Sequence, residues 1–263
     1  MDKTLSTAAT GLSSQQRYIE IISNNLANVN TTGYKKVRPE FQDLLYETLR
    51  PYGNTPQSGS QPLNEVQIGS GTELVSTTKQ FSQGTVEQTG NPYDIAINGN
   101  GFFPVRRPDN TMGYTRDGSF SVDKNGTLVT SQGYILDPEI RIPDDAVQVS
   151  ITRDGIITAK NTGDITTDTE LGRIQLARFI NPAGLRAVGD NIYLPTSASG
   201  EPVVETPGTN NTGELVQNHL ENSNVDLVQE MVNMIVAQRA YEINSKSVKT
   251  ADDILNTAVN LKR

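Results

Sequence analysis

Apolar residues recur at seven-residue spacing near the start of the chain. One column holds Leu5, Leu12, Ile19 and Leu26, and a second column, three residues further on, holds Ala8, Gln15, Ile22 and Val29. Apolar residues at this spacing form one stripe along a helix, and such a stripe favours packing against another helix. The pattern predicts a coiled-coil helix within residues 1–36. The alternative is a single surface helix packed on a globular domain.

A second, more apolar helix is predicted over residues 224–263. It is preceded by Ser223-x-x-Asp226, the spacing of a capping box, with Asn224 as a second candidate N-cap. Its apolar side chains cover more of the circumference than a two-stranded coil buries, so this helix needs neighbours on more than one side. The residues expected to make these contacts are Leu227, Met231, Met234, Ile235, Tyr241, Val248 and Leu255.

Between the helices the pattern changes to short alternating runs. Residues 114–136 place Asp117-Gly118, Asn125-Gly126 and Gln132-Gly133 at hairpin spacing. Turn dipeptides between alternating apolar residues are typical of antiparallel strands. The middle of the chain is therefore predicted to be a mainly antiparallel all-β domain, and the fold class is α+β.

The predicted organisation has five parts. The N-terminal helix with its motif spans 1–36, and an extended connecting and bracing segment rich in proline, glycine and serine follows it. This connecting segment covers residues 37–83. The β domain follows at 84–200, a return linker at 201–223 and the C-terminal coiled-coil helix at 224–263.

Four asparagines crowd the end of the first helix, in "NNLANVNTTGYKK" over residues 24–36. Asparagine is a poor helix-interior residue because its amide competes for nearby backbone groups. We expect Asn24 and Asn28 to share a helix face and to bind a neighbouring backbone or helix, and Asn30 or Gly33 to end the helix. A simple run of capping residues is the alternative. The contact residues expected here are Leu5, Leu12, Ile19, Ile22, Asn24, Asn25, Leu26, Asn28, Val29 and Gly33.

Composition narrows the possible functions. The 263 residues are 35% hydrophobic with no tryptophan, which favours an elongated chain or one that completes its core with copies of itself. The net charge of −8 argues against nucleic acid as a partner. The N-terminus has no apolar core of signal-peptide length, and no apolar run is long enough for membrane insertion.

The sequence offers few residues for a catalytic or metal site. The chain has no cysteine and one histidine, His219, which is expected to be solvated in the return linker. The adjacent pairs Asp144-Asp145 and Asp252-Asp253 point to different faces and do not flank one substrate bond, although distant carboxylates could still converge. We therefore expect no catalytic residues, no metal site and no cofactor. A periplasmic glycan-binding or glycan-cleaving protein is the alternative of a different class.

Several segments resemble the bacterial flagellar rod and hook proteins. "NNLANVNTTGYKK" is close to the family's N-terminal signature, with Ser23 where that pattern has alanine. "SNVDLVQEMVNMIVAQRAYEINSKSVKTADDILNTAVNLKR" is similar to the C-terminal signature, and "AINGNGFFPV" and "YTRDGSFSVDKNGTLVTSQGYIL" are similar to core-domain blocks. Length and the 37–83 stretch are most similar to distal rod members, while proximal rod and hook proteins share the ends.

The resemblance implies a structural subunit that polymerises with itself into a hollow helical shaft and transmits torque. It implies paired terminal helices facing inward and a β domain facing outward. The implied partners are the proximal rod proteins, the hook protein, the surrounding ring proteins and the flagellar export apparatus. The implied location is the basal-body rod across the periplasm, reached without a cleaved signal peptide.

Amphipathic helices without a domain to cover them are weakly ordered alone. We therefore expect residues 1–36 and 224–263 to fold as the chain assembles with its copies.

Overall fold

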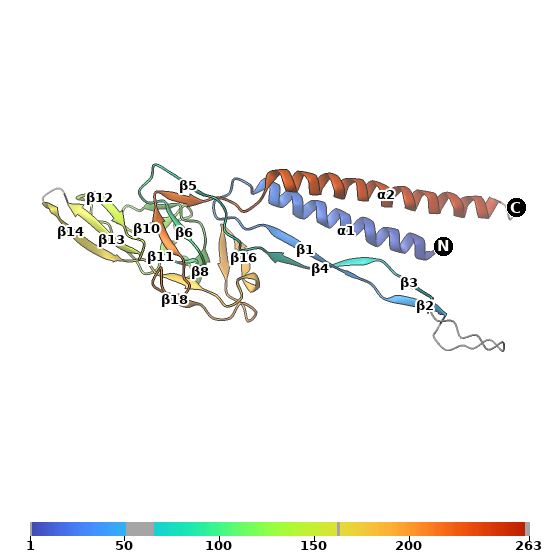
Figure 1. Cartoon of the computed structure of the whole chain (residues 1–263), viewed down its shortest axis with the longest axis horizontal. Coiled ribbons are helices and arrows are strands. Elements are labelled where there is room, and N and C mark those ends of the chain that lie inside the picture. Colours follow the sequence, from blue (N-terminus) through green and yellow to red (C-terminus); the bar gives the residue numbers. More distant parts are fainter. Residues whose placement is uncertain (1, 51–65, 162–163, 261–263) are drawn as a thin grey trace. The chain divides into compact units, whose positions relative to one another are not determined.

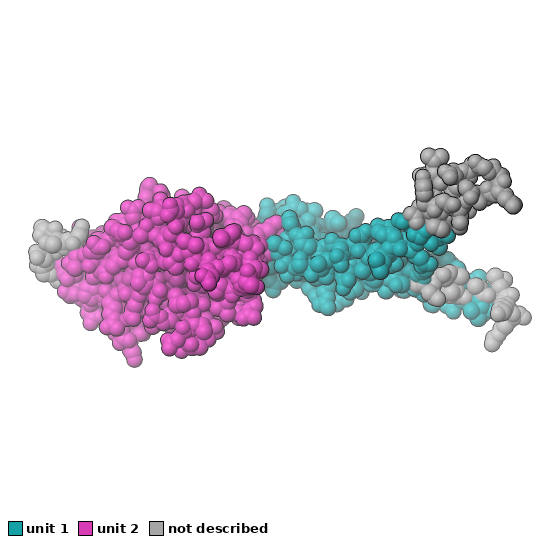
Figure 2. All heavy atoms as spheres, turned by 90° about the horizontal axis from the view of Figure 1, so that it is seen from below, with its two compact units in different colours: residues 1–27, 37–78, 226–263 teal, residues 28–36, 79–225 magenta. Residues whose placement is uncertain are grey.

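A computed structural model describes residues 2–50, 66–161 and 164–260. The chain divides into two compact units (Figure 2). The helical unit consists of Met1–Ala27, Val37–Thr78 and Asp226–Arg263, and the β unit consists of Asn28–Lys36 and Lys79–Val225. Each unit is therefore built from segments that lie far apart in the sequence.

The helical unit pairs the two ends of the chain. Helix α1, Asp2–Ala27, packs along helix α2, Leu227–Asn260, and also contacts strand β1 (Figure 1). The strands of this unit form two separate pairs, β1 with β4 and β2 with β3. Their bounds are Val37–Asp43 for β1, Tyr46–Arg50 for β2, Val66–Gly69 for β3 and Thr72–Lys79 for β4.

Helix α2 buries only one narrow face in a single chain. The described side chains of α2 that are buried or half-buried are Glu230, Asn233, Met234, Ala237, Ala240, Asn244, Ser245, Val248 and Ala251, most of them three or four residues apart. The two helices approach closely because Gly11 of α1 has no side chain. A Cβ atom there would lie 2.9 Å from Nδ2 of Asn244. Of the α2 contact residues expected from the sequence, Met234 and Val248 lie on this face, whereas Leu227, Met231, Ile235 and Tyr241 are exposed.

Asp226 caps helix α2. Its Oδ1 accepts a hydrogen bond of 3.0 Å from the backbone N–H of Gln229, three residues on. The prediction that Ser223 or Asn224 would be the N-cap is wrong, because both residues belong to the β unit and bond elsewhere. An aspartate at this position also faces the positive end of the helix dipole.

The β unit contains one large sheet and several short ones. A seven-stranded sheet has the order β16-β17-β8-β7-β11-β10-β9, and a three-stranded sheet has the order β12-β13-β14. The pairs β15-β18, β19-β6 and β20-β5 complete the unit, and the recorded pairings are antiparallel. A 3-10 turn, η1, spans Pro182–Gly184.

The strand bounds of the β unit are Val86–Gln88 (β5), Ile95–Asn98 (β6), Phe103–Arg106 (β7), Met112–Thr115 (β8), Phe120–Val122 (β9), Leu128–Thr130 (β10), Ile135–Leu136 (β11), Ala146–Ile151 (β12), Ile156–Asn161 (β13), Asp164–Arg173 (β14), Leu176–Arg178 (β15), Arg186–Gly189 (β16), Ile192–Leu194 (β17), Val203–Glu205 (β18), Glu214–Gln217 (β19) and His219–Glu221 (β20).

Alternate side chains along the strands of the β unit point inward and form one apolar core. Its largest members include Ile95, Phe103, Leu128 and Ile157, all essentially inaccessible to solvent. A second cluster stacks aromatic rings edge to face, with Tyr114 and Phe179 at 4.9 Å between ring centres. Burial of these side chains stabilises the unit by roughly 1.5–3 kcal/mol each.

The predicted α+β class is confirmed, with a mainly antiparallel β domain between two terminal helices. Two regions are more ordered than the sequence indicated. Residues 37–79 of the predicted connecting and bracing segment contain four strands, and 51–65 of that segment lie outside the described residues. Residues 201–223 contain three strands, and β19 and β20 each pair with an early strand of the β unit.

Candidate functional site

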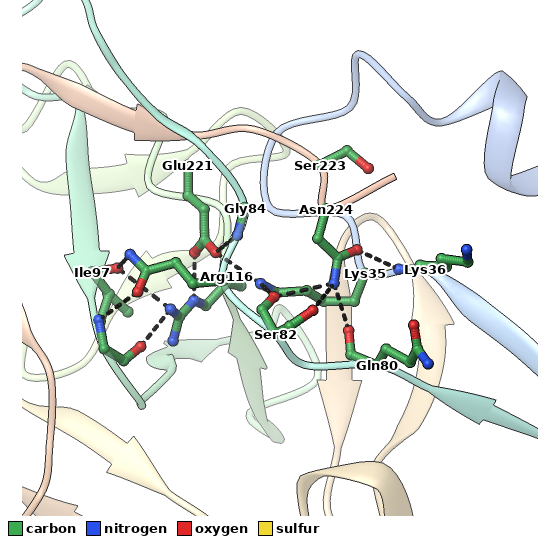
Figure 3. A network of polar contacts seen from close by, with 12 residues as sticks. Lys35, Lys36, Gln80, Ser82, Gly84, Ile97, Arg116, Glu221, Ser223 and Asn224 are labelled. Carbon is green, nitrogen blue, oxygen red and sulfur yellow. Dashed lines mark hydrogen bonds and ion pairs between the residues drawn. The ribbon is translucent and has the colours of Figure 1, made fainter. Parts of the chain in front are cut away.

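A buried carboxylate connects the two ends of the chain inside the β unit. Glu221, the last residue of β20, accepts hydrogen bonds from Lys35 Nζ at 2.7 Å and from Arg116 Nε at 2.6 Å. Its Oε1 also accepts the backbone N–H of Gly84 at 2.9 Å. The side chains of Lys35 and Glu221 are 1% exposed and that of Arg116 is 5% exposed. Figure 3 shows these groups converging on one point.

The two cations extend the network to the backbone. Arg116 donates to the carbonyl oxygens of Gly101 at 2.6 Å, Gly99 at 2.5 Å and Ile97 at 3.3 Å. Lys35 donates to the carbonyl oxygen of Ser82 at 2.8 Å. Buried ion pairs are stable only when further hydrogen bonds satisfy the charged groups, and these contacts supply them. The network therefore fixes several loops around one charge cluster.

The charges act on each other's ionisation. Burial alone raises the pKa of Glu221, but the positive charges of Arg116 and Lys35 and the hydrogen bonds that they donate lower it below its ordinary value of 4.5. Burial lowers the pKa of Lys35, and Glu221 opposes this shift while Arg116 adds to it. One carboxylate is thus shared by two buried cations and offsets part of their charge.

Asn224 fixes the backbone next to this cluster. Its Oδ1 accepts the N–H of Lys36 at 2.7 Å, and its Nδ2 donates to the carbonyl oxygens of Gln80 at 2.8 Å and Ser82 at 3.1 Å. The backbone of Gln80 in turn donates to the carbonyl oxygen of Lys36 at 2.8 Å. A single amide therefore holds the N-terminal motif beside the segment that precedes α2 (Figure 3).

Gly33 allows the N-terminal motif to turn against the cluster. It has a φ of +67°, and its N–H donates to the carbonyl oxygen of Glu221 at 2.8 Å. A Cβ atom there would lie 2.8 Å from the backbone of Arg116 and of Asp117. The position is therefore restricted to glycine both by its φ angle and by the close backbone.

In the helical unit, Asn25 is the asparagine with a clear structural role. Its amide is buried and makes two bonds with the backbone of Val37, accepting the N–H at 3.0 Å and donating to the carbonyl oxygen at 2.9 Å. It also donates to Oε2 of Glu230 in α2 at 3.2 Å. The amide thereby ties α1, β1 and α2 together, as a backbone-like donor and acceptor.

Helix α1 ends at Ala27, so the predicted helix face shared by Asn24 and Asn28 does not form. Asn28 instead turns the chain, with its carbonyl oxygen accepting the N–H of Thr31 at 3.1 Å. Of the two residues expected to end the helix, Gly33 has the left-handed conformation, but it lies beyond the helix end and serves the turn at Glu221.

The predicted contact residues occupy different environments. Ile22, Asn25 and Gly33 are buried within a single chain, which leaves them little surface for a neighbour. Asn24, Leu227, Met231, Ile235 and Tyr241 are exposed. The half-buried residues are Leu5, Leu12, Ile19, Leu26, Asn28, Val29, Met234 and Val248, and of these Asn28 and Val29 lie after α1. The side chain of Leu255 lies outside the described residues.

Sequence reasoning missed Glu221, Arg116 and Asn224. Glu221 lies in the predicted return linker, residues 201–223, and no local sequence pattern indicates that its side chain is buried. His219 in the same segment is also not a solvated linker residue. It belongs to β20, is half-buried, and its Nδ1 lies 2.7 Å from the carbonyl oxygen of Gln217.

The described residues contain no group of three or more histidine, cysteine, aspartate or glutamate side chains placed to hold a metal ion. In the same residues, neither helix is long and apolar enough to cross a membrane.

Three protein-family models match the chain. Residues 5–35 match "Flagella basal body rod protein", residues 96–159 match "Flagellar hook protein FlgE/F/G D1 domain" and residues 204–261 match "Flagellar basal body rod FlgEFG protein C-terminal". The three charged residues of the network, Lys35, Arg116 and Glu221, fall one in each matched segment. The network therefore joins all three parts of the family pattern.

Similar proteins match over their whole length. The flagellar basal-body rod protein FlgG of Borreliella burgdorferi is 47% identical over 100% of both chains. In Caulobacter vibrioides, FlgG is 43% identical over 99% of both chains, and FlgF is 33% identical over 98% of this chain and 97% of the relative. Within that one organism, FlgG is the more similar of the two.

Gly33→Ala tests the close approach at the turn, with Gly133→Ala as a matched control. Gly133 has a φ of +84° and nothing within 4 Å of a Cβ atom. Both variants carry the cost of a left-handed alanine, about 1–2 kcal/mol. Gly33→Ala should lose a further ~1–3 kcal/mol through overpacking against Arg116. Urea unfolding measures both, and equal losses would contradict the packing described here.

Glu221→Gln should lower the unfolding free energy by about 3–5 kcal/mol at neutral pH, because it leaves two buried cations without a counter-charge. The depressed pKa of Glu221 adds stability that is present above pH 4.5 and is lost as the pH falls through its lower folded value. Stability of the parent should thus fall on acidification below 4.5, and the variant should lack this contribution.

The control for Glu221→Gln is Glu214→Gln, which removes a half-exposed carboxylate 4.0 Å from Arg153. We expect the control to change stability by less than about 0.5 kcal/mol. Denaturant midpoints across a pH series measure all three proteins. A Glu221→Gln profile parallel to that of the parent in the acid range would refute the assigned role.

Proposed function

The chain belongs to the family of FlgG-type flagellar basal-body rod proteins, and on this basis we propose how it works as a structural subunit of the distal rod. The subunit polymerises with copies of itself into a hollow, rigid shaft that carries torque from motor to hook. Its role is structural and not enzymatic, as the names of its relatives also indicate.

The exposed apolar face of α2 carries this proposal. Val228 is 70% exposed, Ile243 is 65% exposed and Val236 is 60% exposed. Other large apolar side chains on this helix that remain exposed are Leu227, Met231, Val232, Ile235, Tyr241, Ile254 and Val259. Large exposed apolar patches on soluble proteins mark interaction surfaces. Each exposed Å² that a neighbouring subunit covers contributes about 25 cal/mol.

The face of α2 toward α1 has a different composition. It is formed by small and polar residues such as Ala237, Asn244 and Ala251, which allow close approach of the two helices. We propose that α1 and α2 pair as a coiled coil along this face. The larger aliphatic residues on the other side of α2 then pack against helices of neighbouring subunits. The contact residues expected from the sequence on α2, such as Met231 and Ile235, lie on that outer side.

Assembly and ordering are coupled for the helices in this account. The free energy of covering the apolar face must exceed the roughly 1–2 kcal/mol per residue that ordering the backbone costs. The sequence predicts that residues 1–36 and 224–263 fold on assembly, and the buried network around Glu221 separates these residues into two groups. It supports an anchor of residues 28–36 and 221–225 that is ordered with the β unit, and it leaves α1 and α2 to be ordered by neighbours.

Family membership supports a proposal for the further partners. The subunit joins the proximal rod proteins on one side and the hook protein on the other, and ring proteins surround it where an outer membrane exists. The chain reaches the basal body in the periplasm through the flagellar export apparatus.

Electron microscopy of the concentrated protein tests the function. We expect rods, tubes or stacked rings of regular diameter, with helix content by circular dichroism rising as they form. A chain that stays monomeric at high concentration with constant helix content would contradict the proposal.

Ile235→Asp tests the outer face of α2. Ile235 is 51% exposed in one chain, so an aspartate there leaves the free chain unchanged but is unfavourable when a neighbour covers it. We expect the concentration needed for polymerisation to rise at least about tenfold, equivalent to about 1.4 kcal/mol. The control is Gln238→Asp, which introduces the same residue at an exposed polar position of α2. Equal behaviour of the two variants in sedimentation would argue against this face.

A further inference from the structure

A cavity of about 230 Å³ opens beside the Glu221 network in the β unit. Three basic side chains line it, Lys35, Arg116 and Arg178, together with the rings of Phe81, Phe102 and Phe179. Its lining therefore has a cationic part and an aromatic part. A cavity of about 150 Å³ is large enough for benzene, so this one accommodates a large side chain.

The cationic part has more donors than acceptors. Lys35 has three N–H donors for two acceptors, Glu221 and the Ser82 carbonyl oxygen. Arg116 has five N–H donors for four acceptors. Among the described residues, the carboxylate in contact with these two cations is that of Glu221, and both of its oxygens are already used. Positive charge in the cavity is thus only partly balanced.

Arg178 is the least satisfied of the three. Its Nε is buried, and among the described residues it has no hydrogen-bond partner. None of the ion pairs in the described parts of the chain includes this guanidinium. A buried donor without an acceptor costs about 1–3 kcal/mol, and more when it is charged. An oxygen anion entering the cavity would remove this cost.

The aromatic part of the lining favours an apolar group beside the anion. Phe102 lies edge to face with Phe81 at 5.5 Å and with Phe179 at 5.7 Å between ring centres. Ile180 also lines the cavity and is 84% exposed, so its apolar side chain is accessible to a neighbouring molecule. The complementary group is a carboxylate next to an apolar side chain, both carried by one short segment.

We propose that this cavity receives an acidic side chain and its apolar neighbour from a second copy of the chain. The inference rests on the proposed function, which brings copies into repeated contact. Charge complementarity supports the occupant, because each copy carries 30 acidic against 22 basic residues and a net charge of −8. The contact is made by the β unit and is separate from the helix contacts of α2.

Two substitutions of Arg178 separate this role from a role in folding. Arg178→Met keeps most of the volume and removes the unpartnered donor. The dilute chain should therefore be at least as stable to heat as the parent, because an unsatisfied buried group has been replaced by an apolar one. Polymerisation should nevertheless require at least about a tenfold higher concentration, since a charge-assisted hydrogen bond between copies is lost. Arg178→Glu should weaken polymerisation further by placing like charges together.

The control is Arg186→Glu, the same charge change at an exposed position of edge strand β16. Sedimentation measures the concentration at which each protein polymerises, and thermal melts of the dilute chains report folding. We expect only the Arg178 variants to lose polymerisation, with Arg178→Met melting no lower than the parent.

The outcomes distinguish this inference from the proposed function. If the parent chain fails to polymerise, the proposed function fails. If the parent polymerises and Arg178→Met does so at the same concentration, the cavity contact is refuted while the function stands. A loss of polymerisation in Arg186→Glu as large as in Arg178→Glu would also overturn it, because total charge would then explain the effect.

Discussion

The carboxylate of Glu221 is the interaction on which the described arrangement depends. It accepts hydrogen bonds from Lys35 of the N-terminal motif and from Arg116, the residue that directly follows β8, and it lies six residues before the start of α2 in the sequence. A buried ion pair is weak evidence for high stability, since desolvation offsets much of the attraction. Its effect here is positional. Because each cation must keep its acceptors, the N-terminal motif and the C-terminal segment have one permitted register within the β unit.

The two asparagine amides extend this control to consecutive residues of the backbone. Asn224 holds Lys36 in the β unit, and Asn25 holds Val37 in the helical unit. In the helical unit the same Asn25 amide reaches Glu230, so the end of α1, the start of β1 and the first turn of α2 share one contact point. With the polar groups satisfied inside the chain, the apolar residues on the outer side of α2 remain available to neighbouring subunits.

The sequence predicted the two terminal helices, the antiparallel strands of residues 114–136 and the fold class because those features depend on local periodicity and turn residues. It could not predict the network, which joins residues up to 186 positions apart in the chain. The asparagine cluster was recognised as unusual for a helix end, and Asn25 does bind backbone. The prediction that Asn24 and Asn28 share a helix face was wrong, because α1 ends at Ala27 and the chain then turns. The sequence did not indicate the role of Glu221, because a glutamate in a polar segment has the same local pattern whether its side chain is buried or exposed.

Amide hydrogen exchange, measured on the dilute chain and again on the assembled protein, tests the account most directly. The N–H of Gly33 and of Gly84 both donate to Glu221, so they report the anchor, while the amides of α1 and α2 report the helices. The account predicts that in the dilute chain Gly33 and Gly84 exchange as slowly as the core of the β unit while the helices exchange quickly, and that the helices become protected on assembly. Helix amides as protected in the dilute chain as in the polymer, or an unprotected Gly33 and Gly84, would contradict it.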